Sequence, residues 1–230
     1  MQDVSEKLIL ALDLESEEEA EGLVRKLEGL VSFFKVGIIL DAAAGRDFSR
    51  RMVAAGKKVF LDLKYYDTPQ IVRRAVALAA SQGVSFLTVH GDVRVMEAAV
   101  EGRGGSPMKL LAVTVLTSMD EGDLLKMGMG CTLDELVAAR TRSALELGCD
   151  GVICSGHVIE LVRNIAGDRL IVVTPGIRTE GSEKGGQKRA LSPRDAIKRG
   201  ADYLVVGRPI YASPNPRLAA ERILEDMGGT

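Results

Sequence analysis

The residues best placed for chemistry follow an apolar run, Val59-Phe-Leu-Asp-Leu-Lys-Tyr-Tyr-Asp-Thr-Pro69. The run predicts a buried strand over residues 59–63, and residues two apart on a strand point to the same side, so Asp62 and Lys64 share one face. Two opposite charges on a buried strand are costly unless they are paired or used. In a site, the aspartate keeps the lysine charged, and a fixed cation stabilises an anion formed in a reaction. Either a structural ion pair or a reactive site fits this spacing.

Eight apolar strands, each followed by a helix, are predicted to position these residues. The strands cover residues 8–14, 33–40, 59–63, 85–91, 109–117, 151–156, 170–176 and 203–207. Helices are expected at residues 16–30, 48–55, 69–82, 93–100, 133–147, 157–165, 192–199 and 216–227, with a glycine-containing loop before the fifth. Eight such pairs in 230 residues indicate an α/β fold, a (β/α)8 TIM barrel, rather than an open sheet. No linker marks a second domain, so residues 1–230 are expected to form one catalytic domain.

Composition excludes several classes of function. A net charge of -2 without a basic run argues against a nucleic-acid partner, and no apolar run approaches the roughly 18 residues of a membrane span. The N-terminus lacks the pattern of a signal peptide, and the three cysteines have no paired metal spacing, so we expect a reduced, cytoplasmic protein. With two histidines and no glycine-rich dinucleotide turn after the first strand, we expect neither a metal nor a cofactor.

Polar residues collect at the C-terminal ends of the predicted strands, where barrel enzymes carry their active sites. Any one of them could be a satisfied polar group of the core, but their convergence on one rim is hard to explain by packing. They are Asp13, Lys35, Asp62, Lys64, His90, Thr117, Ser118, Ser155, Thr174, Gly207 and Arg208.

A phosphate site is predicted independently at the ends of strands seven and eight, where barrels often bind phosphate. The loop at residues 178–190 contains three glycines and can move and close, although a solvated surface loop would look similar. Gly207 lets backbone N–H groups approach an anion, and Arg208 offers a planar, bidentate partner.

These motifs together resemble the orotidine 5′-phosphate decarboxylase family over nearly the whole chain. The resemblance rests on Leu10-Ala-Leu-Asp13, Lys35-Val-Gly37, Asp62-Leu-Lys-Tyr-Tyr-Asp67, Val89-His-Gly91, Thr114-Val-Leu-Thr-Ser118, Thr174-Pro-Gly-Ile-Arg178, Gln187 and Gly207-Arg-Pro-Ile210. The Asp-x-Lys-x-x-Asp element is shared by a wider group of phosphosugar-handling barrels. Within that group, Lys35 and the segments Thr174–Arg178 and Gly207–Ile210 are typical of the decarboxylase family.

The resemblance implies cofactor-free conversion of orotidine 5′-phosphate to UMP, the last step of pyrimidine nucleotide synthesis. It makes Lys64 the proton donor to C6 of the pyrimidine and Asp62 the neighbour of the substrate carboxylate. Lys35 and Asp67 complete an alternating array, with Asp67 supplied by the partner subunit of a homodimer. The remaining contacts it implies are Asp13 and Lys35 for the ribose, Thr117 or Ser118 for the pyrimidine, Thr68 beside Asp67, and Arg178, Gln187, Gly207 and Arg208 for the phosphate.

One position departs from the family pattern. The family reads Asp-Ile-Pro-x-Thr after its last aspartate, and that threonine contacts the ribose across the dimer. This chain reads Asp67-Thr-Pro-Gln-Ile71, and an isoleucine side chain makes no hydrogen bond, so that contact is lost or moved. Apolar residues near Asp67 fit either a dimer interface or ordinary helix core: Ile71, Val72, Val93, Val95 and Met96.

Two other functions stay open. Related barrels, 3-keto-gulonate phosphate decarboxylase and hexulose phosphate synthase, bind Mg²⁺ and carry an acidic residue where Lys35 stands, and a lysine there would repel the ion. A non-catalytic protein that binds a phosphorylated ligand is the alternative from another class, but it would not need a buried array of lysines and aspartates.

Overall fold

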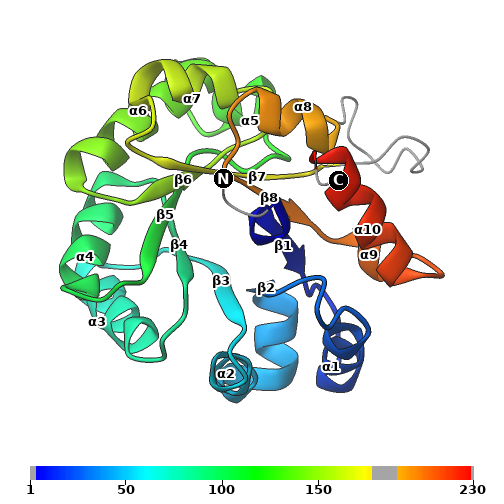
Figure 1. The fold of residues 1–230 in the computed structure, drawn as a ribbon. Coiled ribbons are helices and arrows are strands. Elements are labelled where there is room, and N and C mark those ends of the chain that lie inside the picture. The colour runs from blue at the N-terminus through cyan, green and yellow to red at the C-terminus, as the bar shows by residue number, and fades with distance from the viewer. Residues whose placement is uncertain (1–3, 178–190, 229–230) are drawn as a thin grey trace.

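The computed structural model describes residues 4–177 and 191–228. Within these residues, eight parallel strands close into a barrel in sequence order, with the helices outside (Figure 1). The strands are β1 (Leu8–Ala11), β2 (Phe33–Gly37), β3 (Lys58–Tyr65), β4 (Phe86–His90), β5 (Lys109–Val113), β6 (Gly151–Ile153), β7 (Ile171–Pro175) and β8 (Tyr203–Val206). The predicted TIM barrel is confirmed.

Each predicted helix has a counterpart in the structure, and several helices begin and end at favourable capping residues. For example, Thr132 accepts a hydrogen bond from the Glu135 N–H at the start of α6, and Gly148 ends that helix with a φ of 84°. The helical elements are η1 (Val4–Lys7), α1 (Glu17–Lys26), α2 (Ile38–Ala54), α3 (Pro69–Ala80), α4 (Val93–Arg103), α5 (Glu121–Lys126), α6 (Leu133–Leu147), α7 (Ile159–Ala166), α8 (Pro193–Lys198), α9 (Arg208–Tyr211) and α10 (Pro216–Asp226). Within the described residues, no helix is both long and apolar enough to cross a membrane.

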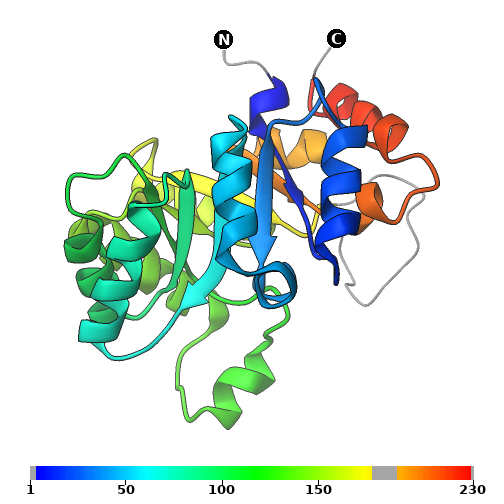
Figure 2. The same ribbon diagram turned by 90° about the horizontal axis from the view of Figure 1, so that it is seen from below.

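Several predicted boundaries at the mouth of the barrel are wrong. The first and sixth strands end three residues earlier than expected, at Ala11 and Ile153. The second strand ends at Gly37, and residues 38–40 begin α2, in which the chain bends at Gly45. Ile38 and Ile39 are 63% and 50% exposed, so their apolar character did not signal a buried strand. The fifth strand ends at Val113 rather than residue 117, and α5 lies in the segment predicted as a loop. Figure 2 shows this green segment projecting beyond the barrel mouth.

The core has two parts, one between the strands and helices and one inside the barrel. Inside the barrel, Phe33 and Phe86 meet edge to face with ring centroids 4.9 Å apart, and Phe86 meets Tyr203 at 5.1 Å. These rings come from the N-terminal halves of β2, β4 and β8. They fill the barrel below the strand ends and leave the polar residues at its mouth on a packed floor.

Candidate active site

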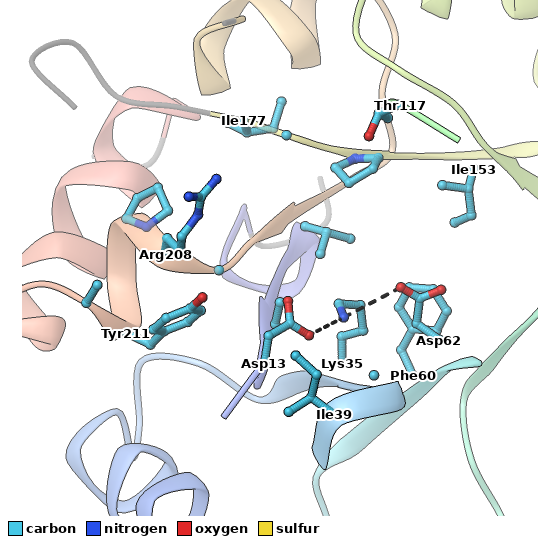
Figure 3. Close-up of a pocket in the computed structure, with 18 of the residues that line it drawn as sticks. Asp13, Lys35, Ile39, Phe60, Asp62, Thr117, Ile153, Ile177, Arg208 and Tyr211 are labelled. Carbon is cyan, nitrogen blue, oxygen red and sulfur yellow. Dashed lines mark hydrogen bonds and ion pairs between the residues drawn. The ribbon is translucent and has the colours of Figure 1, made fainter. Parts of the chain in front are cut away.

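Four charged side chains of alternating sign form a row across the mouth of the barrel. Lys35 Nζ lies 2.8 Å from Asp13 Oδ1 and 3.5 Å from Asp62 Oδ2, and Lys64 Nζ lies 2.8 Å from Asp62 Oδ1. Figure 3 shows Lys35 between Asp13 and Asp62. The row therefore runs Asp13, Lys35, Asp62, Lys64, and each lysine faces at least one carboxylate.

The register of the first three strands places these residues side by side. Lys35 on β2 lies opposite Ala11 on β1, and Asp62 on β3 lies opposite Gly37 on β2. A Cβ at Gly37 would lie 2.8 Å from Asp13 Oδ1 and 2.9 Å from Lys35 Nζ. A side chain at this position would therefore displace the ion pair between Asp13 and Lys35.

Asp62 is held as a carboxylate. Burial alone would raise its pKa, but the charges of Lys35 and Lys64, with hydrogen bonds from Lys64 and Thr88, outweigh burial and leave the pKa below its usual value. Its side chain is 15% exposed, whereas the Lys64 side chain is 32% exposed. The row thus presents a more accessible ammonium group beside a buried anion.

The end of β3 departs from a regular strand. Leu61 pairs with Leu87 and Tyr65 with Val89, so three residues of β3 lie opposite the single residue Thr88 of β4. Lys64 has a φ of 48° and is the sole non-glycine residue with positive φ among the described residues. Asp62 and Lys64 share a side, as the spacing predicts, but a bulge rather than a regular pleat aims Lys64.

A cavity of about 1150 Å³ opens at the barrel mouth beside this row. Arg208, Gly207 and Tyr211 line it on the side of β8 and α9, whereas Thr117 lines it beyond the end of β5. Figure 3 shows Arg208 and Thr117 across the cavity from Asp13 and Lys35. The cavity can hold a ligand with an anionic group at one end and a reacting group beside Lys64 at the other.

Comparison with known proteins decides the family. The sequence profile described as "Orotidine 5'-phosphate decarboxylase / HUMPS family" matches residues 6–223. The chain belongs to this family. An orotidine 5′-phosphate decarboxylase from Nitrobacter winogradskyi is 51% identical over 222 residues, covering 96% of this chain and 92% of the relative. Another from Rhodopseudomonas palustris is 48% identical and covers 97% and 95%. The crystal structure of the Lactobacillus acidophilus orotidine 5′-phosphate decarboxylase superposes with a TM-score of 0.83 at 35% identity, covering 96% of this chain and 99% of that structure.

The predicted resemblance to the orotidine 5′-phosphate decarboxylase family is thus confirmed. Most site residues carried over from it lie together in the structure. Seven of them line the cavity: Asp13, Lys35, Asp62, Lys64, Thr117, Gly207 and Arg208. Arg178 and Gln187, predicted to contact the phosphate, lie outside the described residues.

The other rim residues lie outside the cavity lining as far as the described residues define it. Asp67 and Thr68 are exposed beyond β3, where Asp67 accepts a hydrogen bond from its neighbour's N–H. His90 packs against Tyr66, with ring centroids 4.3 Å apart and the ring planes tilted by 40°, and does not line the cavity. Ser118, Ser155 and Thr174 are also absent from the lining, which leaves Thr117 as the better placed of the two residues predicted to contact the pyrimidine.

Sequence reasoning missed two residues of the site. Tyr211 lines the cavity from α9, and the nearby Asp13 carboxylate adds to burial in raising its pKa. Thr88 contacts both Asp62 and Lys64 from β4. In the described part of the chain, no three His, Cys, Asp or Glu side chains lie together as a metal site would require.

Proposed function

We propose that this protein decarboxylates orotidine 5′-phosphate to UMP without a cofactor, the last step of pyrimidine nucleotide synthesis. Its relatives are named for that reaction. The observation that carries the proposal is the alternating row, in which Lys64 lines the cavity with its ammonium 2.8 Å from the Asp62 carboxylate. We take residues 1–230 as one catalytic domain acting in the cytoplasm, as the sequence predicts.

The reaction needs little beyond a fixed cation and a proton. The bond between C6 and the carboxylate breaks, its electron pair stays on C6, and carbon dioxide leaves. The Lys64 ammonium stabilises the developing anion and donates a proton to C6, after which the amine regains a proton from water. Asp62 faces the departing carboxylate and pairs with Lys64, while Lys35 pairs with both Asp62 and Asp13.

The far end of the cavity is assigned to the phosphate. Gly207 directly follows β8 and is the N-cap residue of α9, and Arg208 comes next and lines the cavity. Among the described residues, Arg208 has no carboxylate partner, so its guanidinium is available to an anion. Arg178 and Gln187 are proposed to join it, whereas Thr117 meets the pyrimidine and Asp13 with Lys35 the ribose.

Asp67 is proposed to act across a homodimer, with Thr68 beside it. Asp67 lies beyond the end of β3 and does not line the cavity of its own chain. In a two-fold symmetric dimer, it would instead reach the row of charged residues in the partner subunit. Of the five apolar residues that fit either this interface or helix core, Ile71 and Val93 are 47% and 46% exposed. The structure assigns the other three, Val72, Val95 and Met96, to the core, where each is at most 2% exposed.

A spectrophotometric assay with orotidine 5′-phosphate tests the function. We expect turnover that EDTA does not reduce. Loss of turnover in EDTA and recovery with Mg²⁺ would favour the Mg²⁺-dependent relatives instead. Binding of the nucleotide without turnover would favour a binding protein.

A further inference from the structure

Thr88 lies opposite the bulge that carries the reactive lysine. Its hydroxyl is fully buried and has three polar neighbours, all on β3. The Lys64 N–H lies 3.0 Å from Thr88 Oγ1, Asp62 Oδ1 also lies at 3.0 Å, and the Leu61 carbonyl oxygen lies at 3.5 Å. A single side chain on the neighbouring strand therefore contacts both the backbone of Lys64 and the side chain of Asp62.

The hydrogen-bonding capacity of a hydroxyl fixes the direction of these contacts. A threonine hydroxyl has one proton to donate, and the Lys64 N–H can only donate, so Oγ1 accepts from Lys64. The proton then goes to Asp62 Oδ1, which is nearer than the Leu61 oxygen and is charged. The same carboxylate oxygen accepts the Lys64 ammonium at 2.8 Å. Thr88, Asp62 and Lys64 thus form a closed ring of hydrogen bonds.

We infer that Thr88 is a positioning residue, which holds Lys64 in its left-handed conformation and Asp62 in its rotamer so that the ammonium faces the reacting carbon. The inference rests on the proposed function. In a regular ladder the Lys64 N–H would bond to a backbone carbonyl of β4, but the bulge removes that partner and the Thr88 hydroxyl replaces it. A left-handed lysine is unfavourable and persists only where its surroundings impose it.

The test compares Thr88→Val, which keeps the shape but removes the hydroxyl, with Thr88→Ser, which restores the hydroxyl. We expect Thr88→Val to lower kcat about 30-fold, or about 2 kcal/mol, because the ammonium is no longer fixed, with KM changing less than about threefold. Thr88→Ser should stay within about threefold of the wild type in kcat. Hydrogen exchange of the Lys64 N–H should be faster in Thr88→Val and near the wild-type rate in Thr88→Ser.

Thr141→Val is the matched control. Thr141 is also fully buried, but its hydroxyl donates to the Val137 carbonyl oxygen within α6, away from the site. This variant should keep kcat and the exchange rate of the Lys64 N–H, whatever its effect on melting temperature. If Thr88→Val does not fold, Thr88→Ala replaces it in the same comparison.

The outcomes separate this inference from the proposed function. If the wild-type protein does not decarboxylate orotidine 5′-phosphate, the proposed function fails. If the wild type is active and Thr88→Val keeps its kcat, Thr88 does not position Lys64. The inference is also overturned if Thr88→Ser is as impaired as Thr88→Val, or if Lys64 N–H exchange is unchanged in Thr88→Val.

Discussion

Both ends of the barrel hold aspartates beside cations. The cations at the N-terminal end bind the protein itself, whereas those at the C-terminal end line the cavity. At the N-terminal end, Asp150 and Asp202 each directly precede a strand and accept the N–H of the strand before it, at 3.0 Å from Leu110 and 2.7 Å from Val172. An arginine completes each cluster, Arg103 for Asp150 and Arg163 for Asp202. At the C-terminal end, the cations are lysines and the nearest open space is the cavity.

Arg163 illustrates the N-terminal arrangement. Its guanidinium donates to the carbonyl oxygens of Gly167, Leu170 and Gly200 and to the Asp202 carboxylate, all at 2.6 to 2.9 Å. These bonds occupy its rigid fork of donors and tie α7 to the starts of β7 and β8. An arginine with its donors used in this way has little left for a ligand.

Lys64 shows the opposite arrangement. Its ammonium has three N–H donors, yet among the described residues its side chain donates one hydrogen bond, to Asp62. Lys64 lines the cavity, and its backbone has a positive φ that is unfavourable for a residue other than glycine. A cation with free hydrogen-bond donors on a strained backbone, such as Lys64, indicates a functional role. A cation whose donors all bind the protein itself, such as Arg163, indicates a structural role.

The largest effect should come from removing the cation at the mouth. Lys64→Ala is expected to lower kcat at least a thousandfold, about 4 kcal/mol, because both the fixed charge and the proton donor are lost. The free energy of unfolding should change by less than about 1 kcal/mol, because Lys64 is partly exposed and the buried Asp62 carboxylate keeps Lys35 as a partner. Lys58→Ala, at the other end of β3, is the control and should keep kcat. A Lys64→Ala protein with a tenth of wild-type turnover would contradict the assigned role.

The second prediction tests whether the mouth is completed by another copy. Lys64→Ala and Asp67→Asn proteins, each nearly inactive, are mixed under conditions of subunit exchange. Random pairing makes half of the dimers mixed, and each mixed dimer has one intact site, so about a quarter of wild-type activity should return. If exchange is demonstrated by a mass tag and no activity returns, Asp67 acts within its own chain.

The phosphate end should give an effect on binding rather than on chemistry. Arg208→Ala is expected to raise KM about 100-fold with a smaller change in kcat, since a charge-assisted, bidentate contact to the phosphate is lost. Arg217→Ala, an arginine on α10 paired with Glu221, is the control. Phosphite should promote turnover of the phosphate-free nucleoside by the wild type. Equal turnover of nucleoside and nucleotide would contradict the phosphate assignment.

The sequence predicts the barrel and the charged row well because both depend on simple patterns. Apolar strands alternating with helices specify the eight pairs, and the strand ends then bring Asp13, Lys35 and Asp62 together. The pattern does not predict the bulge opposite Thr88, because that distortion depends on pairing between strands. Thr88 itself lies in the apolar run Phe86-Leu-Thr-Val-His90, where a threonine fits an ordinary strand.

The N-terminal clusters were also missed, although the chain carries a signal for them. Cys149-Asp150-Gly151 and Ala201-Asp202-Tyr203 each place an aspartate just before a strand. The arginine partners lie 47 and 39 residues earlier in the chain, and the contact depends on how the helices pack. Nothing in the local sequence specifies that pairing.

Breaking an N-terminal cluster should affect stability alone. Asp202→Ala is expected to lower the free energy of unfolding by about 2 kcal/mol, because the Val172 N–H and the half-buried Arg163 lose a partner. Asp47→Ala, in an exposed pair with Arg50, should cost less than about 0.5 kcal/mol. Urea unfolding measures both, and kcat per folded molecule should not change. A fall in kcat at full folding would show that the two ends are coupled.

The smallest expected effect concerns His90. This residue lies at the C-terminal end of the barrel, but we expect it to affect stability rather than turnover, as the N-terminal clusters do. Burial lowers its pKa, the charge of Arg140 lowers it further, and Asp92 opposes them, so the folded state favours the neutral ring. Near pH 6 the unfolded chain therefore binds more protons than the folded protein. The stabilisation that comes from keeping His90 neutral is fully present above the unfolded pKa of about 6.5, and it is lost as the pH falls below that value.

His90→Phe, which keeps a ring to pack against Tyr66, should therefore lose less stability than the wild type between about pH 7.5 and about pH 5.5. The difference is bounded by about 1.4 kcal/mol for each pH unit over which one proton is taken up. Urea unfolding at the two pH values measures it, and kcat should stay within about threefold, since the ring does not line the cavity. Equal pH dependence in both proteins would mean that the ring is not held neutral, and a large fall in kcat would make His90 part of the site rather than of its support.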